Sequence, residues 1–273
     1  MLTKIIICWF LIIQIPVFSK AQVVYNNTVR EIGIGGSPIA FSFVTCINSN
    51  PSFIPENNNL LVSAMVVSNY SIVELNSYAL YYQNKIGSNQ RLTLAIINTG
   101  NNIFSQKQAE AAIGKTIGKK ITAGLKLSFI ESTLKDKFYK NSYTITPDVA
   151  FNLNPFKNIY IGVLVRNPVR SRMNANEGRP LPSEIISGIT YKVSEKLILH
   201  TSVKQRSDEL PSILSGIEYL YHEHLTIRAG YHTAPISQSL GFSLKIHPLI
   251  IELSISTHPF LGYTSGAGII FSL

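Results

Sequence analysis

The chain has few charged residues and few cysteines. Only 14% of its 273 residues are charged, below the quarter that is usual in soluble domains, while 45% are hydrophobic. Its two cysteines are Cys8 and Cys46. Cys8 lies in an N-terminal stretch that we expect to be removed, which excludes an intramolecular disulfide in the mature chain. The basic residues, which give a formal net charge of +9, are scattered rather than clustered, which argues against a nucleic-acid-binding surface.

No long apolar run follows the first 21 residues, so the sequence offers no helical membrane anchor beyond them. Those residues themselves have the organisation of a secretory signal. Lys4 precedes the apolar stretch Ile5–Phe18, and Ser19-Lys20-Ala21 then places small residues at the usual cleavage positions. We predict that residues 1–21 are a cleaved signal peptide and that the mature protein leaves the cytoplasm.

The C-terminal part of the chain alternates apolar and polar side chains, which is the period of a β-strand. In residues 249–256, one face carries Leu249, Ile251, Leu253 and Ile255, and the other carries Glu252, Ser254 and Ser256. The same alternation recurs before and after this segment, reset by short turns. A long series of strands with one apolar and one polar face is typical of a transmembrane β-barrel.

We count about fourteen strand candidates, an even number that suits a single-chain bacterial barrel. They are residues 59–70, 73–84, 90–99, 107–116, 120–131, 142–153, 158–167, 184–193, 197–206, 212–221, 225–233, 238–246, 249–257 and 264–273. The barrel therefore occupies residues 59–273. Residues 22–58 do not follow the strand pattern and form a separate N-terminal segment.

The connections between the predicted strands alternate between tight turns and longer polar loops. Tight turns include His222-Glu223-His224 and His247-Pro248, whereas the longer loops include Glu131–Asn141, Asn167–Ser183 and His258–Tyr263. Outer-membrane barrels have short periplasmic turns and longer external loops. We therefore expect the tight turns to face the periplasm and the long loops to lie outside the cell.

We expect the apolar faces of the strands to point outward. A soluble barrel of about fourteen strands with an apolar interior would contain a void too wide for side chains to fill, so this alternative is rejected. A two-sheet extracellular sandwich remains as a structural alternative. With polar faces inward, the predicted lumen is lined by Lys126, Arg166, Lys192, Lys204, Glu218, Arg228, Lys245 and Glu252.

Six glycines fall on the polar face of predicted strands, where glycine normally weakens a sheet. They are Gly124, Gly162, Gly188, Gly216, Gly230 and Gly241. We favour the interpretation that small residues relieve crowding inside a closed sheet. The alternatives are local curvature and room for something packed against the inner wall.

The sequence contains no convincing catalytic, cofactor or metal motif. His222-Glu223-His224 has two metal-binding residue types, but it lies in a predicted tight turn and no third ligand is nearby in sequence. Gly35-Gly36 lacks the pattern of a phosphate-binding loop. We therefore predict that the protein is not an enzyme and needs no cofactor.

Two short motifs in residues 22–58 carry a resemblance to a known family. They are Gly35-Gly36-Ser37 and Asn50-Pro51-Ser52, separated by the apolar run Ile39–Val44 and followed by the strands. This order resembles the FadL-like outer-membrane proteins, in particular the PorV/PorQ branch that is linked to type IX secretion. The resemblance implies that residues 22–58 fold into the barrel as a plug, with Gly35, Gly36, Asn50 and Pro51 as its motif residues. Ser52 and Phe53 depart from the Ala-Gly of the family.

Two functions follow from these observations. The PorV/PorQ resemblance implies a secretion-associated barrel of the Gram-negative outer membrane that acts through contacts with secretion-system or secreted proteins, and this is the function that we favour from the sequence. The alternative is a passive channel for small hydrophobic molecules, gated by the plug. In either case the partner of the outer surface is the lipid of the outer membrane.

Overall fold

The chain forms one closed antiparallel sheet. The computed structural model describes residues 27–37, 40, 50–53, 60–87, 89–135, 141–174 and 180–272, and within them lie fourteen strands. They are β1 (Leu60–Ser68), β2 (Asn76–Ile86), β3 (Gln90–Gly100), β4 (Phe104–Ile117), β5 (Ile121–Leu134), β6 (Ser142–Phe156), β7 (Ile159–Arg166), β8 (Glu184–Lys192), β9 (Leu197–Arg206), β10 (Ser212–His222), β11 (Leu225–Thr233), β12 (Ile236–Ile246), β13 (Leu249–His258) and β14 (Gly262–Ser272). Each predicted strand range overlaps one of these, so the predicted barrel is confirmed.

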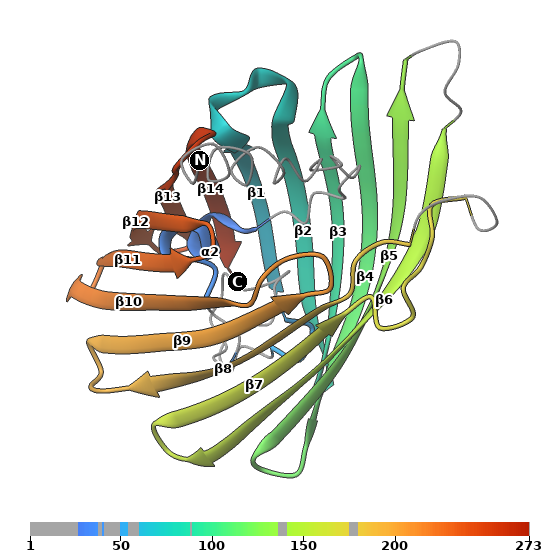
Figure 1. The fold of residues 1–273 in the computed structure, drawn as a ribbon. Coiled ribbons are helices and arrows are strands. Elements are labelled where there is room, and N and C mark those ends of the chain that lie inside the picture. The colour runs from blue at the N-terminus through green and yellow to red at the C-terminus, as the bar shows by residue number, and fades with distance from the viewer. Residues whose placement is uncertain are drawn as a thin grey trace, which may run out of the picture.

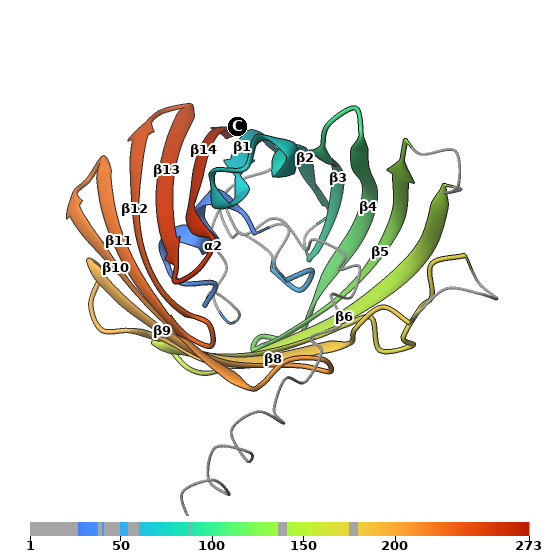
Figure 2. The same cartoon turned by 45° about the horizontal axis from the view of Figure 1, so that its top comes forward.

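The barrel closes because its first and last strands pair. Each strand pairs antiparallel with its neighbours in sequence, and β1 pairs with β14 in a register that runs from Leu61 opposite Ser272 to Ser68 opposite Ser265. The ring is seen from one end in Figure 2. Closure satisfies the backbone hydrogen bonds of every strand without leaving an edge, which is the condition for a sheet to cross a bilayer. This closed sheet excludes the sandwich alternative.

The apolar faces point outward, as the alternation predicts. On β13, Leu253 is 53% exposed while its neighbour Glu252 is 2% exposed. On β12, Leu244 is likewise exposed and Ser243 is buried. Because the outward residues are mainly Leu, Ile, Val and aromatic side chains, the outer surface suits contact with hydrocarbon.

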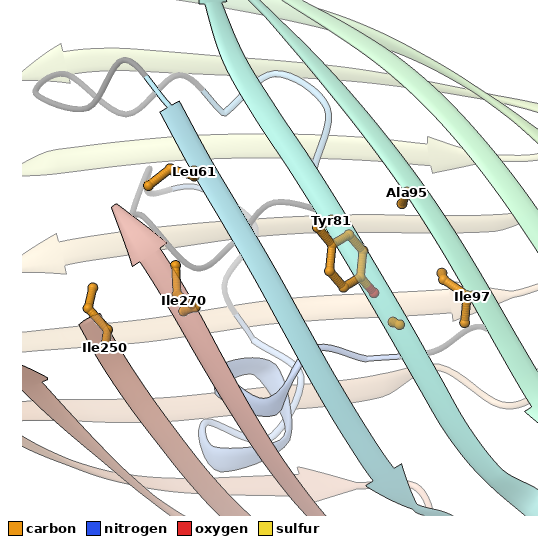
Figure 3. Packing of buried hydrophobic residues seen from close by; sticks show 7 residues of the cluster. Leu61, Tyr81, Ala95, Ile97, Ile250 and Ile270 are labelled. Carbon is orange, nitrogen blue, oxygen red and sulfur yellow. The ribbon is translucent and has the colours of Figure 1, made fainter. Parts of the chain in front are cut away.

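The inner wall is less uniformly polar than the sequence pattern predicts. Seven inward residues from β13, β14, β1, β2 and β3 form a buried apolar cluster (Figure 3), namely Leu61, Ala79, Tyr81, Ala95, Ile97, Ile250 and Ile270. Ile250 and Ile270 are direct cross-strand partners. Side chains alternate between the two faces along each strand, and these apolar residues fall on the inward positions. The inner wall therefore carries an apolar patch at this place.

The connections differ between the two ends of the barrel. One end carries tight turns, such as the one between β12 and β13, and the other carries the longer connections. The connection between β1 and β2 contains two short 3-10 helices, η1 (Asn69–Ser71) and η2 (Val73–Leu75), and contacts β14. The long loop between β7 and β8 contains an isolated bridge between Arg172 and Pro180. The predicted alternation of short and long connections is therefore present in most places, but the connections at 101–103 (β3 to β4) and 234–235 (β11 to β12), which share the end with the long loops, are also short.

Among the described residues, no helix is both long and apolar enough to cross a membrane.

Part of the N-terminal segment lies inside the barrel. A five-residue helix, α2 (Val29–Gly33), contacts β11, β12, β13 and β14 and is seen within the ring in Figures 1 and 2. The predicted signal peptide (residues 1–21) and Cys46 lie outside the described residues, as does the run Ile39–Val44 apart from Ala40. The predicted division of the chain at residues 21 and 58 therefore stays a prediction.

Candidate functional site

The helix α2 is defined by its own N-terminal residues. Thr28 caps it by accepting a hydrogen bond at Oγ1 from the backbone N–H of Glu31 (3.3 Å), and the backbone N–H of Thr28 donates to Oε2 of Glu31 (2.6 Å). This capping box satisfies two backbone donors that the helix leaves free. All five helical residues are buried inside the barrel, including Arg30.

Residues 33–35, at the end of α2 and just after it, pack closely against glycines of the inner wall. A Cβ atom placed on Gly230 would lie 2.1 Å from the backbone N of Gly35, and one on Gly216 would lie 2.7 Å from the carbonyl oxygen of Ile34. A Cβ atom on Gly241 would lie 3.0 Å from Cα of Gly33. The interpretation that these glycines merely relieve crowding is therefore wrong for this wall, because backbone from residues 33–35 fills the space that side chains would need.

The second motif contacts a different part of the wall. A Cβ atom on Gly124 of β5 would lie 2.2 Å from the carbonyl carbon of Pro51. Asn50 accepts hydrogen bonds at Oδ1 from the backbone N (2.9 Å) and the hydroxyl (2.6 Å) of Ser52, and it donates to Asn152 of β6 (3.4 Å). The Ser52 departure from the family motif thus supplies a hydroxyl that closes the turn.

All four predicted plug residues lie against the inner wall. Gly35 and Gly36 have positive φ angles of 65° and 76°, which glycine adopts without strain. Ser37, which follows them, is held by Ser202 of β9, whose hydroxyl donates to the Ser37 carbonyl (2.8 Å). The segment therefore contacts the β9–β12 wall through one motif and β5 and β6 through the other.

A buried ionic network joins α2 to the barrel. Arg30 pairs with Glu218 of β10, and Glu218 also accepts from Nε of Arg228 on β11 (2.8 Å) and bonds to Nε2 of His200 on β9 (2.8 Å). Arg228 in turn contacts Glu252 of β13 (3.1 Å). All five side chains are at most 5% exposed. The inner wall thus presents the buried carboxylate of Glu218 to Arg30 of α2.

The other predicted lumen residues occupy different surroundings. Lys126 contacts Asp148 (3.1 Å) and Glu110 (3.5 Å), and Arg166 contacts Glu184 (2.7 Å), all buried on the inner wall. Lys192 instead pairs with Glu195 in an exposed tight turn (2.6 Å). Lys245 is exposed near the tight turn between β12 and β13. Lys204 is partly buried and lines a cavity. The structure therefore joins Glu218, Arg228 and Glu252 in one network, and Arg166 and Lys204 both line the cavity.

The cavity lies between α2 and the long-loop end of the barrel. It has a volume of about 550 Å³. Its floor includes Glu31, Ile32, Gly35 and Gly36, and its walls come from the ends of strands that lead into the longer connections. Apolar lining residues are Ile32, Val67, Leu75, Ile186, Leu214, Pro235 and Leu261. Charged residues also line it, and two of them, Arg166 and Glu184, neutralise each other.

Three residues of this site are not predicted by the sequence pattern. Arg30 carries the ionic contact of α2, while Tyr70 of η1 and His258 of β13 line the cavity at its outer end. Tyr70 and His258 form an edge-to-face pair with ring centroids 5.4 Å apart. No periodic signal marks these residues, because Arg30 meets a strand far away in the sequence and the Tyr70–His258 pair depends on closure between β1 and β14.

The described part of the chain holds no metal-binding cluster. No group of three or more His, Cys, Asp or Glu side chains there is arranged to hold a metal ion. Nε2 of His224 lies 3.5 Å from Oε1 of Glu223, and both side chains are exposed in the turn between β10 and β11.

Comparisons with known proteins identify the fold. No family model matches the sequence, and no curated protein matches it. Among solved structures, the monoaromatic hydrocarbon channel CymD has a TM-score of 0.68 at 12% identity, covering 93% of this chain and 99% of that one. The Pseudomonas putida toluene transporter TodX has a TM-score of 0.67 at 11% identity, with the same coverage. A Pseudomonas aeruginosa FadL homologue has a TM-score of 0.60 at 8% identity, covering 92% and 98%.

The fold is therefore FadL-like over nearly the whole chain. Two of the similar structures are a monoaromatic hydrocarbon channel and a toluene transporter, and whether this chain is an enzyme stays a prediction from its sequence. The same comparisons lend no support to the PorV/PorQ branch, which the short motifs alone indicated. Two motifs of three residues each are too short to separate branches that share one barrel.

Proposed function

We propose that this protein is an outer-membrane channel for small hydrophobic molecules and that residues 22–58 are its plug. The observation that carries the proposal is the cavity of about 550 Å³ above α2, inside a barrel of the fold found in hydrocarbon channels. Its size is within the range of pockets that hold small organic ligands. Its apolar residues provide contacts for a hydrocarbon, while its ion pairs offer no dominant charge to attract a free ion.

The proposed location follows from the surface and the ends of the barrel. The apolar outer face meets the membrane lipid, the tight turns face the periplasm, and the cavity opens toward the long loops on the cell exterior. A ligand that enters from outside then reaches α2 before it can pass further. The segment of residues 22–58 is well placed to act as a gate, since its two motifs contact opposite parts of the inner wall.

The type IX secretion role stays a second hypothesis. One observation favours a protein partner, namely that the long-loop end carries apolar side chains outside the strands, with Phe260 89%, Leu210 79% and Val169 67% exposed. The channel is the better supported function, because a cavity inside the barrel has no use in a protein that acts only through its outer loops.

The channel proposal is tested by hydrocarbon uptake. The full-length protein is produced in a Gram-negative host, whose lipopolysaccharide leaflet resists hydrocarbons, and accumulation of radiolabelled toluene is followed over seconds. We expect faster uptake than in cells with an equal amount of a control barrel. Equal rates, with the barrel shown to be folded and in the outer membrane, would reject the channel and leave the secretion hypothesis.

A further inference from the structure

The backbone at the outer end of the cavity is held in an unusual conformation. Tyr70 and Ser71 have positive φ angles of 57° and 56°, which two successive non-glycine residues rarely adopt. Such conformations persist only where the surroundings enforce them, and they concentrate at ligand-binding positions. Here they direct the connection between β1 and β2 toward β14, as Figure 2 shows at the rim of the ring.

Hydrogen bonds hold this connection without help from the Tyr70 ring. The backbone N–H of Tyr70 donates to Oγ1 of Thr264 (3.1 Å), and the hydroxyl of Ser71 donates to the carbonyl oxygen of Tyr263 (3.2 Å). Asn69 donates to the carbonyl oxygen of Leu75 (2.8 Å) and to the hydroxyl of Ser77 (3.0 Å). The Tyr70 ring is therefore not needed to fasten η1, and its position over the cavity calls for another explanation.

The ring opposite Tyr70 is also oriented by bonds that are independent of the pair. Nδ1 of His258 accepts from the backbone N–H groups of Phe260 and Leu261, each at 3.2 Å. This fixes the imidazole plane at 80° to the ring of Tyr70, in an edge-to-face arrangement. Both residues line the cavity beside Leu75 and Leu261, so the Tyr70–His258 ring pair lies at the border of the enclosed space.

The Tyr70 side chain remains a neutral phenol at physiological pH. Burial raises the pKa of its hydroxyl, and the negative charge of Glu209 in the connection between β9 and β10 raises it further. A neutral ring presents its face and its hydrogen-bearing edge to a ligand without the cost of removing a charge from water. Aromatic rings prefer offset or edge-to-face neighbours, and the Tyr70–His258 pair offers a ligand ring the means to make such contacts.

We propose that Tyr70 and His258 form a recognition site for an aromatic ring and make the cavity selective for aromatic over saturated molecules of equal size. The proposal rests on the proposed function for its biological meaning, but the binding it describes is measurable without transport. An aromatic ligand has a negative ring face and a positive ring edge, so it can make edge-to-face or offset contacts with Tyr70 and His258. A saturated ring of equal size buries a similar apolar area but cannot make these contacts.

The test compares phenol with cyclohexanol, which share a six-membered ring and one hydroxyl group. Binding to the purified, folded full-length protein is measured by saturation-transfer NMR titration. We expect phenol to bind more tightly. Tyr70→Leu removes the ring and keeps apolar bulk, and His258→Asn removes the ring while the amide oxygen still accepts from the N–H groups that follow it. Each variant should weaken phenol binding by about two- to ten-fold and leave cyclohexanol binding unchanged.

Tyr70→Phe is the matched control, because it keeps the ring and loses only the hydroxyl, and it should bind phenol like the unmodified chain. Folding of each variant is checked by its mobility on an unheated gel. Equal losses for phenol and cyclohexanol, no loss for phenol in either ring-removing variant, or no preference for phenol in the unmodified chain would each overturn the proposal. Selective binding without toluene uptake would instead reject the channel and leave the aromatic site standing.

Discussion

Single residues determine how closely the N-terminal segment approaches the barrel wall. Gly230 and Gly124 have no side chain, and the backbone of residues 33–35 and 50–53 occupies the vacated space. A closed barrel has no flexibility to move a strand outward by several ångström, since each strand is bonded on both sides. The contact is therefore intolerant of even a methyl group on the wall.

Gly230→Ala should displace the segment without unfolding the barrel. Its new Cβ atom would lie 2.1 Å from the backbone N of Gly35, a distance that neither backbone can accommodate. We expect Cys46, the only cysteine after the predicted cleavage site, to react faster with a bulky thiol reagent in this variant. Gly268→Ala is the control, since its Cβ atom would meet the Val29 side chain at 3.3 Å, and its labelling rate should match the unmodified protein. Equal labelling rates in both variants would contradict the close packing of Gly35 against Gly230.

Glu218 is the second residue on which the segment depends. It is the shared partner of Arg30, Arg228 and His200, all buried. Glu218→Ala leaves Arg30 without its carboxylate and should destabilise the refolded protein by about 3–5 kcal/mol, as breaking a buried pair from one side does. Urea unfolding in detergent micelles measures this loss.

A double variant separates the ion pair from its surroundings. Arg30→Met combined with Glu218→Gln removes both charges and should recover much of the stability that Glu218→Ala loses. Lys192→Ala, which removes an exposed pair in a tight turn, should leave the unfolding midpoint unchanged. If Glu218→Ala and Lys192→Ala unfold at the same urea concentration, the network does not hold the segment.

At the level of strands, one residue step along the chain decides between lipid and lumen. Leu244→Arg places a charge on the outer face of β12 and should cost about 2–4 kcal/mol if the position is near the bilayer midplane. Thr226 of β11 is the cross-strand partner of Ser243 and lies at the same height on the inner wall, partly exposed. Thr226→Arg should therefore fold normally. The folding yields of Leu244→Arg and Thr226→Arg in lipid vesicles are compared. Equal yields would show that the outer and inner faces are assigned wrongly.

The strands were predictable because each carries its own evidence. The alternation of Leu249, Ile251 and Leu253 with Glu252 and Ser254 is local, and the turns between strands are marked by polar residues. The pairing of consecutive strands then follows from the short connections. The motif residues Gly35, Gly36, Asn50 and Pro51 were also visible locally, and the structure places them against the wall, while their role as a plug stays a prediction.

The site was only partly predictable because it depends on contacts across the ring. Arg30 meets Glu218 over a separation of 188 residues, and Tyr70 meets His258 only when β1 pairs with β14. Neither contact leaves a period in the sequence. Lys192 and Lys245 were predicted to line the lumen but lie at the rim of the barrel, near tight turns. The alternation gives the face of the sheet on which a residue lies, but it does not give the height of the residue along the barrel.

At the scale of the whole molecule, closure of the ring and filling of its lumen are separate properties. The fourteen strands close the ring by pairing with one another, so the barrel does not need residues 22–58 to complete its sheet. The described parts of the segment contact the wall at glycines, through Arg30, and through the hydrogen bonds of Ser37 and Asn50, and none of these contacts pairs with a strand as a further strand would. Removal of the segment should thus leave a folded barrel whose unheated form still migrates faster on a gel than its boiled form.

Deletion of residues 22–58 should convert the barrel into an open pore. The described parts of this segment contact the wall at Gly230 and at Gly124, and water that replaces them would solvate Glu218 and Arg228. A ring of fourteen strands is wider than the eight-stranded barrels whose interior side chains fill the lumen. Single-channel recordings in planar bilayers should therefore show larger and steadier ion currents for the deletion variant than for the full-length protein. Glu218→Gln, which weakens one anchor and keeps the segment, should show brief openings between these extremes. Full-length and shortened proteins that conduct equally would mean that the segment does not close the lumen, because an ion path would then already exist beside α2.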